Sequence, residues 1–223
     1  AKDHNIPLLV WYGIEPLVGA DAARGLALAT VSRHPQTTDF IYRRLASDAR
    51  ARSQVLSLAL REQDAARRAS LVSRVVEGVR QSGSFSAPEG WAALVAGLRQ
   101  GASPDLLANL NELDALTGDE ASRAYYRGHL ADVKAPLPAR QRALAVLVAS
   151  RDRAAAPVIH QVLAEKTTPS FRRALIQALA TVGDENSPAV LLGRFGVFSP
   201  EQLGDAALAW LRGLNSGQLP LVE

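Results

Sequence analysis

The histidines are the first side chains of this 223-residue sequence that could do chemistry, because a paired set could bind a metal ion. There are four of them, far apart along the chain: His4, His34, His129 and His160. No two have the i, i+4 spacing with which one face of a helix holds a metal. We therefore expect no metal site, and we expect His129 to hydrogen-bond Asp132 one helical turn further on.

The closely spaced carboxylates are the second candidates, because paired acids can act as general acid and base. They fall at expected helix ends, where negative charge stabilises the positive end of the next helix: Glu112/Asp114, Asp119/Glu120 and Asp184/Glu185. The sequence also contains no nucleophile elbow, phosphate-binding loop or dinucleotide-binding motif. We therefore expect no catalytic residue and no cofactor in this segment.

Aromatic and charged side chains gather near the N-terminus, in residues 3–16 (DHNIPLLVWYGIEP). On a helix, Trp11 and Glu15 are one turn apart, so the carboxylate can approach the indole N–H. One interpretation is an end cap, in which the aromatic rings close the core against solvent. The other is a docking face for an adjoining domain. Both stay open at this point.

Arginines are concentrated in the first third of the chain, where residues 1–82 hold twelve Lys/Arg and eight Asp/Glu. A nucleic-acid surface would need them in a stripe with exposed aromatic or amide groups. Acidic residues interrupt the arginines and only Tyr42 is nearby, which argues against nucleic acid as the partner. The candidate interface predicted from both regions is Trp11, Tyr12, Glu15, Tyr42, Arg43 and Arg44.

Prolines and glycines mark the elements that must position these residues. Proline suits the first helical turn, and glycine suits the left-handed residue that ends a helix. Ser199 and Gln202 have the spacing of a capping box. Between these marks apolar residues recur with helical spacing, and no strand-like alternation occurs. We predict an all-α protein of about thirteen helices, over 6–16, 21–33, 37–47, 49–62, 64–81, 88–99, 104–116, 119–133, 138–150, 156–165, 169–182, 187–195 and 200–213.

A repeat organises the last third of the chain. An Ala-Leu pair followed by a further apolar residue recurs at Ala143, Ala174 and Ala207, at separations of 31 and 33 residues. A period of this length containing two helices is typical of an α-solenoid of HEAT-like hairpins. We expect the three alanines to lie where facing helices approach closely.

Composition limits the class of protein, and one Ser/Gly-rich stretch predicts where its two regions join. A hydrophobic content of 48% and no apolar run of membrane-spanning length exclude a disordered chain and a membrane span. The chain has neither Met nor Cys, which suggests a piece of a longer protein without disulfides. Residues 82–87 (SGSFSA) predict a joint between an N-terminal helical region, 1–82, and HEAT-like repeats, 83–223, within one continuous solenoid.

Residues 3–16 resemble a stretch of large multidomain proteins of planctomycetes and verrucomicrobia, the haem-binding membrane-bound dehydrogenase family of the Pirellula/Verrucomicrobium type. Residues 40–46 (FIYRRLA) and the loop leading into Gly90-Trp91 are similar as well. In that family the segment follows a sugar-dehydrogenase-like β-propeller and precedes a c-type cytochrome domain. The resemblance spans the chain, although only its first sixteen residues are distinctive.

The resemblance implies a helical spacer in a larger redox protein, placed outside the cytoplasm because c-type haem is attached there. The function expected of this segment is a non-catalytic scaffold or interaction domain, with adjoining domains of the same chain or a protein partner as its ligands. The alternative is a stand-alone HEAT-like module that binds an anionic partner such as nucleic acid. Steep loss of heparin binding with salt would distinguish the alternative.

Overall fold

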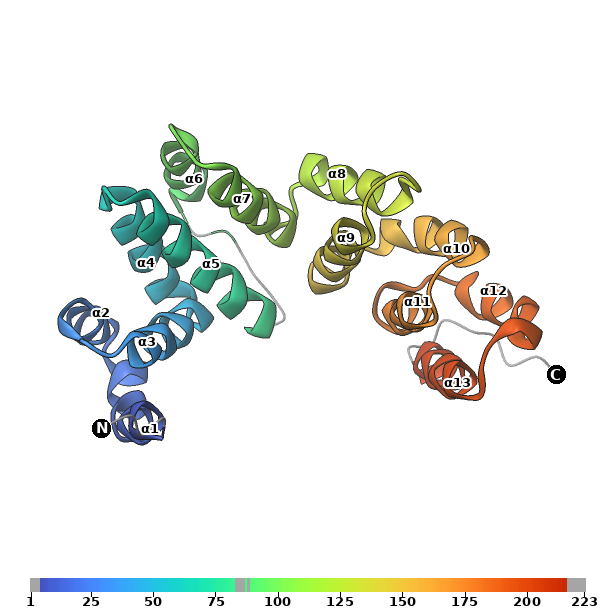
Figure 1. Ribbon diagram of the computed structural model, residues 1–223, viewed down its shortest axis with the longest axis horizontal. Helices are drawn as coiled ribbons and strands as arrows, with labels where there is room; N and C mark the ends of the chain where they lie inside the picture. The colour runs from blue at the N-terminus through green and yellow to red at the C-terminus, as the bar shows by residue number, and fades with distance from the viewer. Residues whose placement is uncertain (1–4, 83–86, 88, 216–223) are drawn as a thin grey trace. The chain divides into compact units, whose positions relative to one another are not determined.

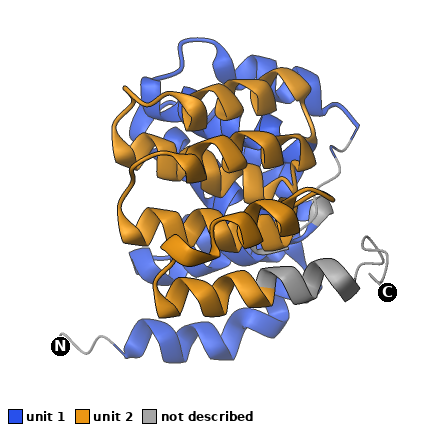
Figure 2. Ribbon diagram, turned by 90° about the vertical axis from the view of Figure 1, so that its right-hand side faces the viewer, with its two compact units in different colours: residues 1–117 blue, residues 118–223 orange. Residues whose placement is uncertain are grey.

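The computed structural model describes residues 5–82, 87 and 89–215 of the chain. Within these residues it contains thirteen α-helices, two short 3₁₀ helices and no strand, which confirms the predicted all-α class and helix count (Figure 1). Contacts divide the chain into two compact units, residues 1–117 and 118–223 (Figure 2). Each unit is described by itself below.

The first unit holds seven helices in two layers. Helices α1, α3, α5 and α7 pack against one another in sequence, while α4 packs on α2 and on α6 in the second layer. Consecutive helices also contact each other from α1 to α5, and α6 contacts α7. The helices are α1 (Ile6–Ala20), α2 (Ala22–Val31), α3 (Pro35–Ser47), α4 (Ala49–Arg61), α5 (Ala65–Ser82), α6 (Trp91–Arg99) and α7 (Pro104–Thr117).

The second unit repeats this arrangement with six helices. Helix α11 packs on α9 and α13 in one layer, and α10 packs on α8 and α12 in the other. The helices are α8 (Glu120–Ala131), α9 (Leu137–Ala149), α10 (Ala156–Ala164), α11 (Pro169–Val182), α12 (Ser187–Gly193) and α13 (Pro200–Asn215), with 3₁₀ helices η1 (Arg153–Ala155) and η2 (Phe195–Val197). A continuous solenoid over both units stays a prediction.

The two units divide between Thr117 and Gly118, whereas the sequence places a joint at residues 82 and 83. The reason is packing across the Ser/Gly-rich stretch, since α7 packs on α5 and α6 packs on α4. Residues 83–86 and Pro88 themselves lie outside the described residues. Gly118 has a φ of +97°, which a glycine adopts without steric strain.

Helix ends agree with the sequence-based ranges to within two residues, with two exceptions. Helix α6 begins at Trp91 rather than at residue 88, after Gly90 in the left-handed region. Helix α1 runs through Pro16 to Ala20 rather than ending at residue 16. Pro16 is exposed, so the carbonyl group that loses its hydrogen bond to the proline can be solvated.

Local capping follows the sequence closely at the start of α13. The backbone N–H of Ser199 donates to Gln202 Oε1 at 3.0 Å, and the Gln202 N–H donates to Ser199 Oγ at 3.4 Å, which confirms the capping box. The Gln202 amide also donates to the Pro169 carbonyl oxygen at the start of α11, at 3.1 Å. The same side chain thus caps one helix and ties it to its neighbour.

Three arginines tie consecutive helices together across their loops. In each case the arginine lies near the start of one helix, and its Nε–H donates to a carbonyl oxygen at or just after the end of the preceding helix. The pairs are Arg52 to Ala46 at 2.8 Å, Arg68 to Glu62 at 3.0 Å and Arg140 to Leu130 at 2.9 Å. These bonds satisfy carbonyl groups that the helix end leaves without a partner. The arginines of the first third therefore do not form one solvent-facing stripe.

The close approach predicted for the three repeated alanines holds for only part of the set. Ala143 is buried, Ala174 is partly buried, and Ala207 is exposed, so the prediction is wrong at Ala207. In α13 the preceding residue, Ala206, is buried instead, because one position along a helix turns the side chain by about 100°. A closer approach occurs at Gly78, where a Cβ would lie 2.5 Å from the Cβ of Ala46.

Candidate functional site

Trp11 lies on the side of α1 that faces α3. Its ring centroid is 5.7 Å from that of Phe40, and the two ring planes are tilted by 40°. The side chain is partly buried in this contact. Such a tilted aromatic pair stabilises the packing of the first helix on its neighbour. This placement favours the end-cap interpretation for Trp11 over a role in docking.

Glu15 and Arg44 form an ion pair between α1 and α3. The Arg44 Nε lies 3.5 Å from the Glu15 carboxylate, and its Nη1 donates to Ser47 Oγ at 3.3 Å. Glu15 was expected to approach the Trp11 indole, but its ion-pair partner is Arg44. Both side chains are more than a third exposed, so the pair contributes little to stability. Its role is to fix the orientation of two interface candidates.

Arg43 is held inside the α1–α3–α5 layer. Its guanidinium carbon lies 5.5 Å from the Phe40 ring centroid, and its Nε lies 3.6 Å from the Glu77 carboxylate of α5. Glu77 also binds Arg74, which in turn binds Asp39 at 3.0 Å. Arg43 is therefore engaged within the fold, and a partner would have to compete with these contacts.

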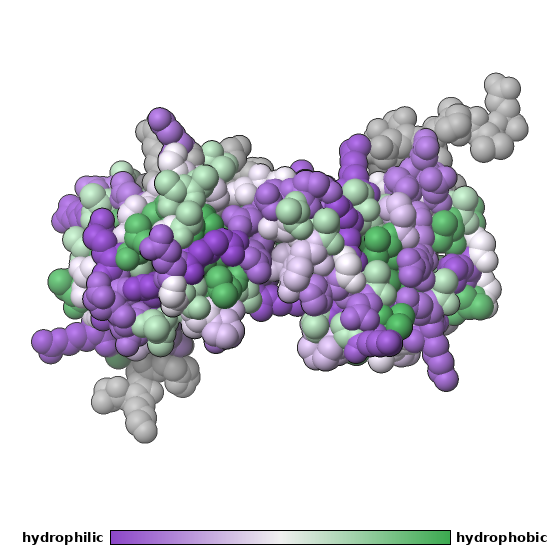
Figure 3. All heavy atoms as spheres, turned by 90° about the horizontal axis from the view of Figure 1, so that it is seen from above, coloured by the Kyte–Doolittle hydropathy of each residue, from purple (hydrophilic) through white to green (hydrophobic). Residues whose placement is uncertain are grey.

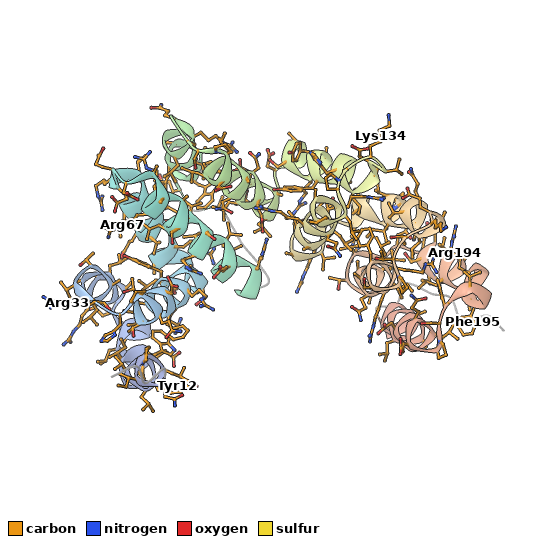
Figure 4. The ribbon with its side chains drawn as sticks, viewed as in Figure 1. Tyr12, Arg33, Arg67, Lys134, Arg194 and Phe195 are labelled. Atoms are coloured by element: carbon orange, nitrogen blue, oxygen red, sulfur yellow. The ribbon has the colours of Figure 1, made fainter. Side chains whose placement is uncertain are left out.

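Tyr42 belongs to a different surface from Trp11. It is 7% exposed and lines a hollow with Arg33 and Arg67. Figure 4 labels these two arginines on the first unit. Burial raises the pKa of its hydroxyl group; Arg67 opposes this effect and Glu62 adds to it. The phenol therefore stays protonated at neutral pH and can donate a hydrogen bond.

Tyr12 is the member of the predicted interface that faces solvent on α1. It is 63% exposed (Figure 4), and Leu9 beside it is 67% exposed. Together with further exposed side chains of the same helix they make up what we term the α1 apolar face: Ile6, Leu9, Val10, Tyr12 and Leu17. The structure thus separates Tyr12 from Trp11, which was grouped with it in the sequence.

Sequence reasoning missed most of the α1 apolar face, although a signal for it was present. Glu15 is the single charged residue among the fifteen of α1, so the helix has no polar side to turn to solvent. On the face seen in Figure 3, hydrophobic side chains occur in small groups separated by hydrophilic ones.

A Ser–His–Asp cluster in the second unit was not predicted. His160 Nε2 lies 3.0 Å from Ser187 Oγ, which donates to Asp184 Oδ1 at 3.1 Å. A catalytic triad requires the carboxylate on the other ring nitrogen of the histidine. Here Asp184 Oδ1 is 3.9 Å from Nε2 itself, and it accepts the Ser187 N–H at the start of α12. The cluster caps a helix and does not form a nucleophilic relay.

The pH dependence of stability tests this structural role. Burial lowers the pKa of His160; Arg194 adds to this effect and Asp184 opposes it. The unfolded chain therefore binds the proton more readily, and stability falls as pH drops below about 6.5 through the folded-state pKa. We expect His160→Gln to flatten this loss between about pH 7 and pH 5, measured by urea denaturation. Equal pH profiles for the two proteins would contradict the assignment, because they differ only at residue 160.

The structure also tests the prediction made for His129. His129 packs edge-on against the Tyr125 ring with centroids 4.3 Å apart, and Asp132 accepts the Lys134 N–H, so the predicted His129–Asp132 bond is wrong. His4 lies outside the described residues. In the part of the chain that the structure describes, no three His, Asp or Glu side chains are grouped so that they could hold a metal ion. None of the described helices combines the length and the apolarity of a membrane span.

Comparisons with family models, with curated proteins and with solved structures find no match to this chain.

Proposed function

We propose that this segment is a non-catalytic helical-repeat scaffold that docks an adjoining domain of the same chain, or a protein partner, on the α1 apolar face. The observation that carries the proposal is the face itself. A helix that is apolar on all sides is normally buried, yet Leu9 and Tyr12 are each about two thirds exposed. Contiguous exposed apolar side chains of this kind mark interaction surfaces.

The scaffold is proposed to be an α-solenoid of HEAT-like hairpins. Support comes from the two-layer packing within each unit, in which helices contact those two positions along the chain and, in pairs such as α8–α9, α10–α11 and α12–α13, the next helix. In such stacks each end needs a polar outer face to stay soluble. Helix α1 begins its layer with an apolar outer face instead, which supports a covering domain at that end.

The resemblance of residues 3–16 supports one particular occupant of this face. Most of that run is helix α1. In the family it resembles, a sugar-dehydrogenase-like propeller precedes the segment and a c-type cytochrome domain follows it. We propose the same arrangement here, outside the cytoplasm, with the helical segment as the spacer between the two redox domains.

Cysteine labelling tests the docking. The chain contains no cysteine, so Leu9→Cys places a single thiol on the α1 apolar face. We expect a maleimide to modify it at least tenfold more slowly in the complete gene product, or in native cell extract, than in the isolated 223-residue chain, because a docked face excludes the reagent. Mass spectrometry of the labelled peptide gives the rates.

Val31→Cys is the matched control, since Val31 is exposed at the end of α2 and outside the α1 apolar face. Protection of residue 9 in the purified gene product identifies an adjoining domain, and protection only in extract identifies a separate protein. If both cysteines react at unchanged rates in all three settings, nothing covers α1 and the proposal is rejected.

A further inference from the structure

Two hollows adjoin on the α2 and α4 side of the first unit. One, of about 460 Å³, lies between α2 and α4, and the other, of about 290 Å³, lies where α2 ends and α3 and α5 begin. Thr30 and Leu58 line both, so the two hollows are adjacent. We term this surface the α2–α4 groove and follow four of its residues, Arg33, Tyr42, Ser53 and Arg61.

Two hydroxyl groups that line the groove have no hydrogen-bond partner. Ser53 Oγ is buried and unpartnered. Tyr42 is more than nine-tenths buried, and its hydroxyl has no hydrogen bond to any described residue. Folded proteins rarely leave a buried group such as the Ser53 hydroxyl unsatisfied, so its position at a hollow points to a ligand atom, and the Tyr42 hydroxyl lines the same groove. Both groups can donate, which suits an acceptor oxygen.

The charge of the groove points to the same ligand chemistry. Arg33 and Arg61 are exposed and have no ion-pair partner among the described residues. The carboxylates that line the groove are paired: Glu62 with Arg67 at 3.5 Å, and Asp39 with Arg74 at 3.0 Å. Two positive charges thus remain uncompensated beside two unpaired donors.

We propose that the α2–α4 groove binds an extended acidic segment of a protein partner. Arg33 and Arg61 bind its carboxylates, and the hydroxyls of Tyr42 and Ser53 donate to its carboxylate or backbone carbonyl oxygens. A nucleic acid is disfavoured, because its affinity comes from neutralising many closely spaced phosphates and the groove offers two free arginines. The groove lies apart from the α1 apolar face, so this inference does not depend on the proposed scaffold function.

A phage-displayed library of random decapeptides, panned on the folded 223-residue chain, tests the proposal. We expect enriched peptides to carry at least two carboxylates. The strongest one, labelled with fluorescein, should lose at least tenfold in affinity for the double variant Arg33→Gln/Arg61→Gln, measured by fluorescence anisotropy. Tyr42→Phe, which removes only the hydroxyl, should weaken binding about threefold or more, the loss expected for one hydrogen bond.

The double variant Arg24→Gln/Arg153→Gln is the matched control, because it removes the same net charge from exposed positions that do not line the groove. It should bind the peptide as the parent chain does. Equal losses for the two double variants would show attraction by net charge alone and overturn the proposal. Enrichment of non-acidic peptides, or tighter binding of a ten-nucleotide oligo-dT than of the selected peptide, would also overturn it.

Discussion

Replacing Arg80 by methionine is expected to destabilise the first unit by about 3 kcal/mol, the low end for removing one partner of a buried ion pair. Arg80 of α5 binds the carboxylate of Glu112 on α7, and the Glu112 side chain is fully buried. Without the guanidinium this carboxylate loses a charged partner in a site that water does not reach. The expected loss lies at the low end of the range for buried ion pairs, because the Arg80 side chain itself is 39% exposed. Urea denaturation followed by circular dichroism measures the loss.

Two further variants separate the buried charge from the packing. Adding Glu112→Gln to the Arg80 variant removes the buried negative charge and should restore part of the stability. Arg67→Met breaks the ion pair with Glu62, in which the arginine is 73% exposed, and should cost less than about 1 kcal/mol. Equal losses for the Arg80 and Arg67 variants would show that burial of Glu112 does not matter.

Replacing Phe171 by alanine is expected to destabilise the second unit by about 3–5 kcal/mol, the usual range for emptying a buried aromatic site. Phe171 is fully buried at the start of α11, and the Arg140 guanidinium carbon lies 5.7 Å from its ring centroid. Arg140 also binds Leu130 at the end of α8 and Glu165 after α10. The ring therefore supports an arginine that joins several helices.

Phe195→Ala is the control for this prediction. Phe195 is 47% exposed in η2 (Figure 4), so its truncation should change stability by less than about 0.5 kcal/mol. Thermal unfolding monitored at 222 nm can compare the two variants. If the Phe171 variant unfolds within a degree of the Phe195 variant, the described packing around Arg140 is wrong.

The helices could be predicted from the sequence because their signals are local. Pro104, Pro169 and Pro200 each begin a helix at the predicted residue, since the N–H that proline lacks has no partner in a first turn. Capping by Ser199 and Gln202 likewise depends on residues three positions apart. Pro16 was a misleading signal, because it predicted the end of a helix that continues to Ala20. Pro16 is exposed, so the carbonyl group that loses its hydrogen bond can be solvated.

The candidate site could be predicted only in part, because composition does not say which way a side chain points. Trp11 and Tyr12 are neighbours in sequence, yet one packs on Phe40 and the other faces solvent. Arg43 and Arg44 were grouped as interface residues, whereas both have ion-pair partners inside the first unit. The α2–α4 groove was not predicted, since its residues come from separate helices.

The sequence by itself determined the all-α class, the thirteen helices and nearly all of their ends, because capping, proline and glycine effects act within a few residues. Tertiary structure alone decided which residues meet: that Ala206 rather than Ala207 is buried, that Arg80 reaches Glu112, and that Tyr42 lines a hollow. These outcomes depend on the rotation of each helix about its axis and on its neighbours. That rotation is set by packing among helices distant in sequence, which no local pattern encodes.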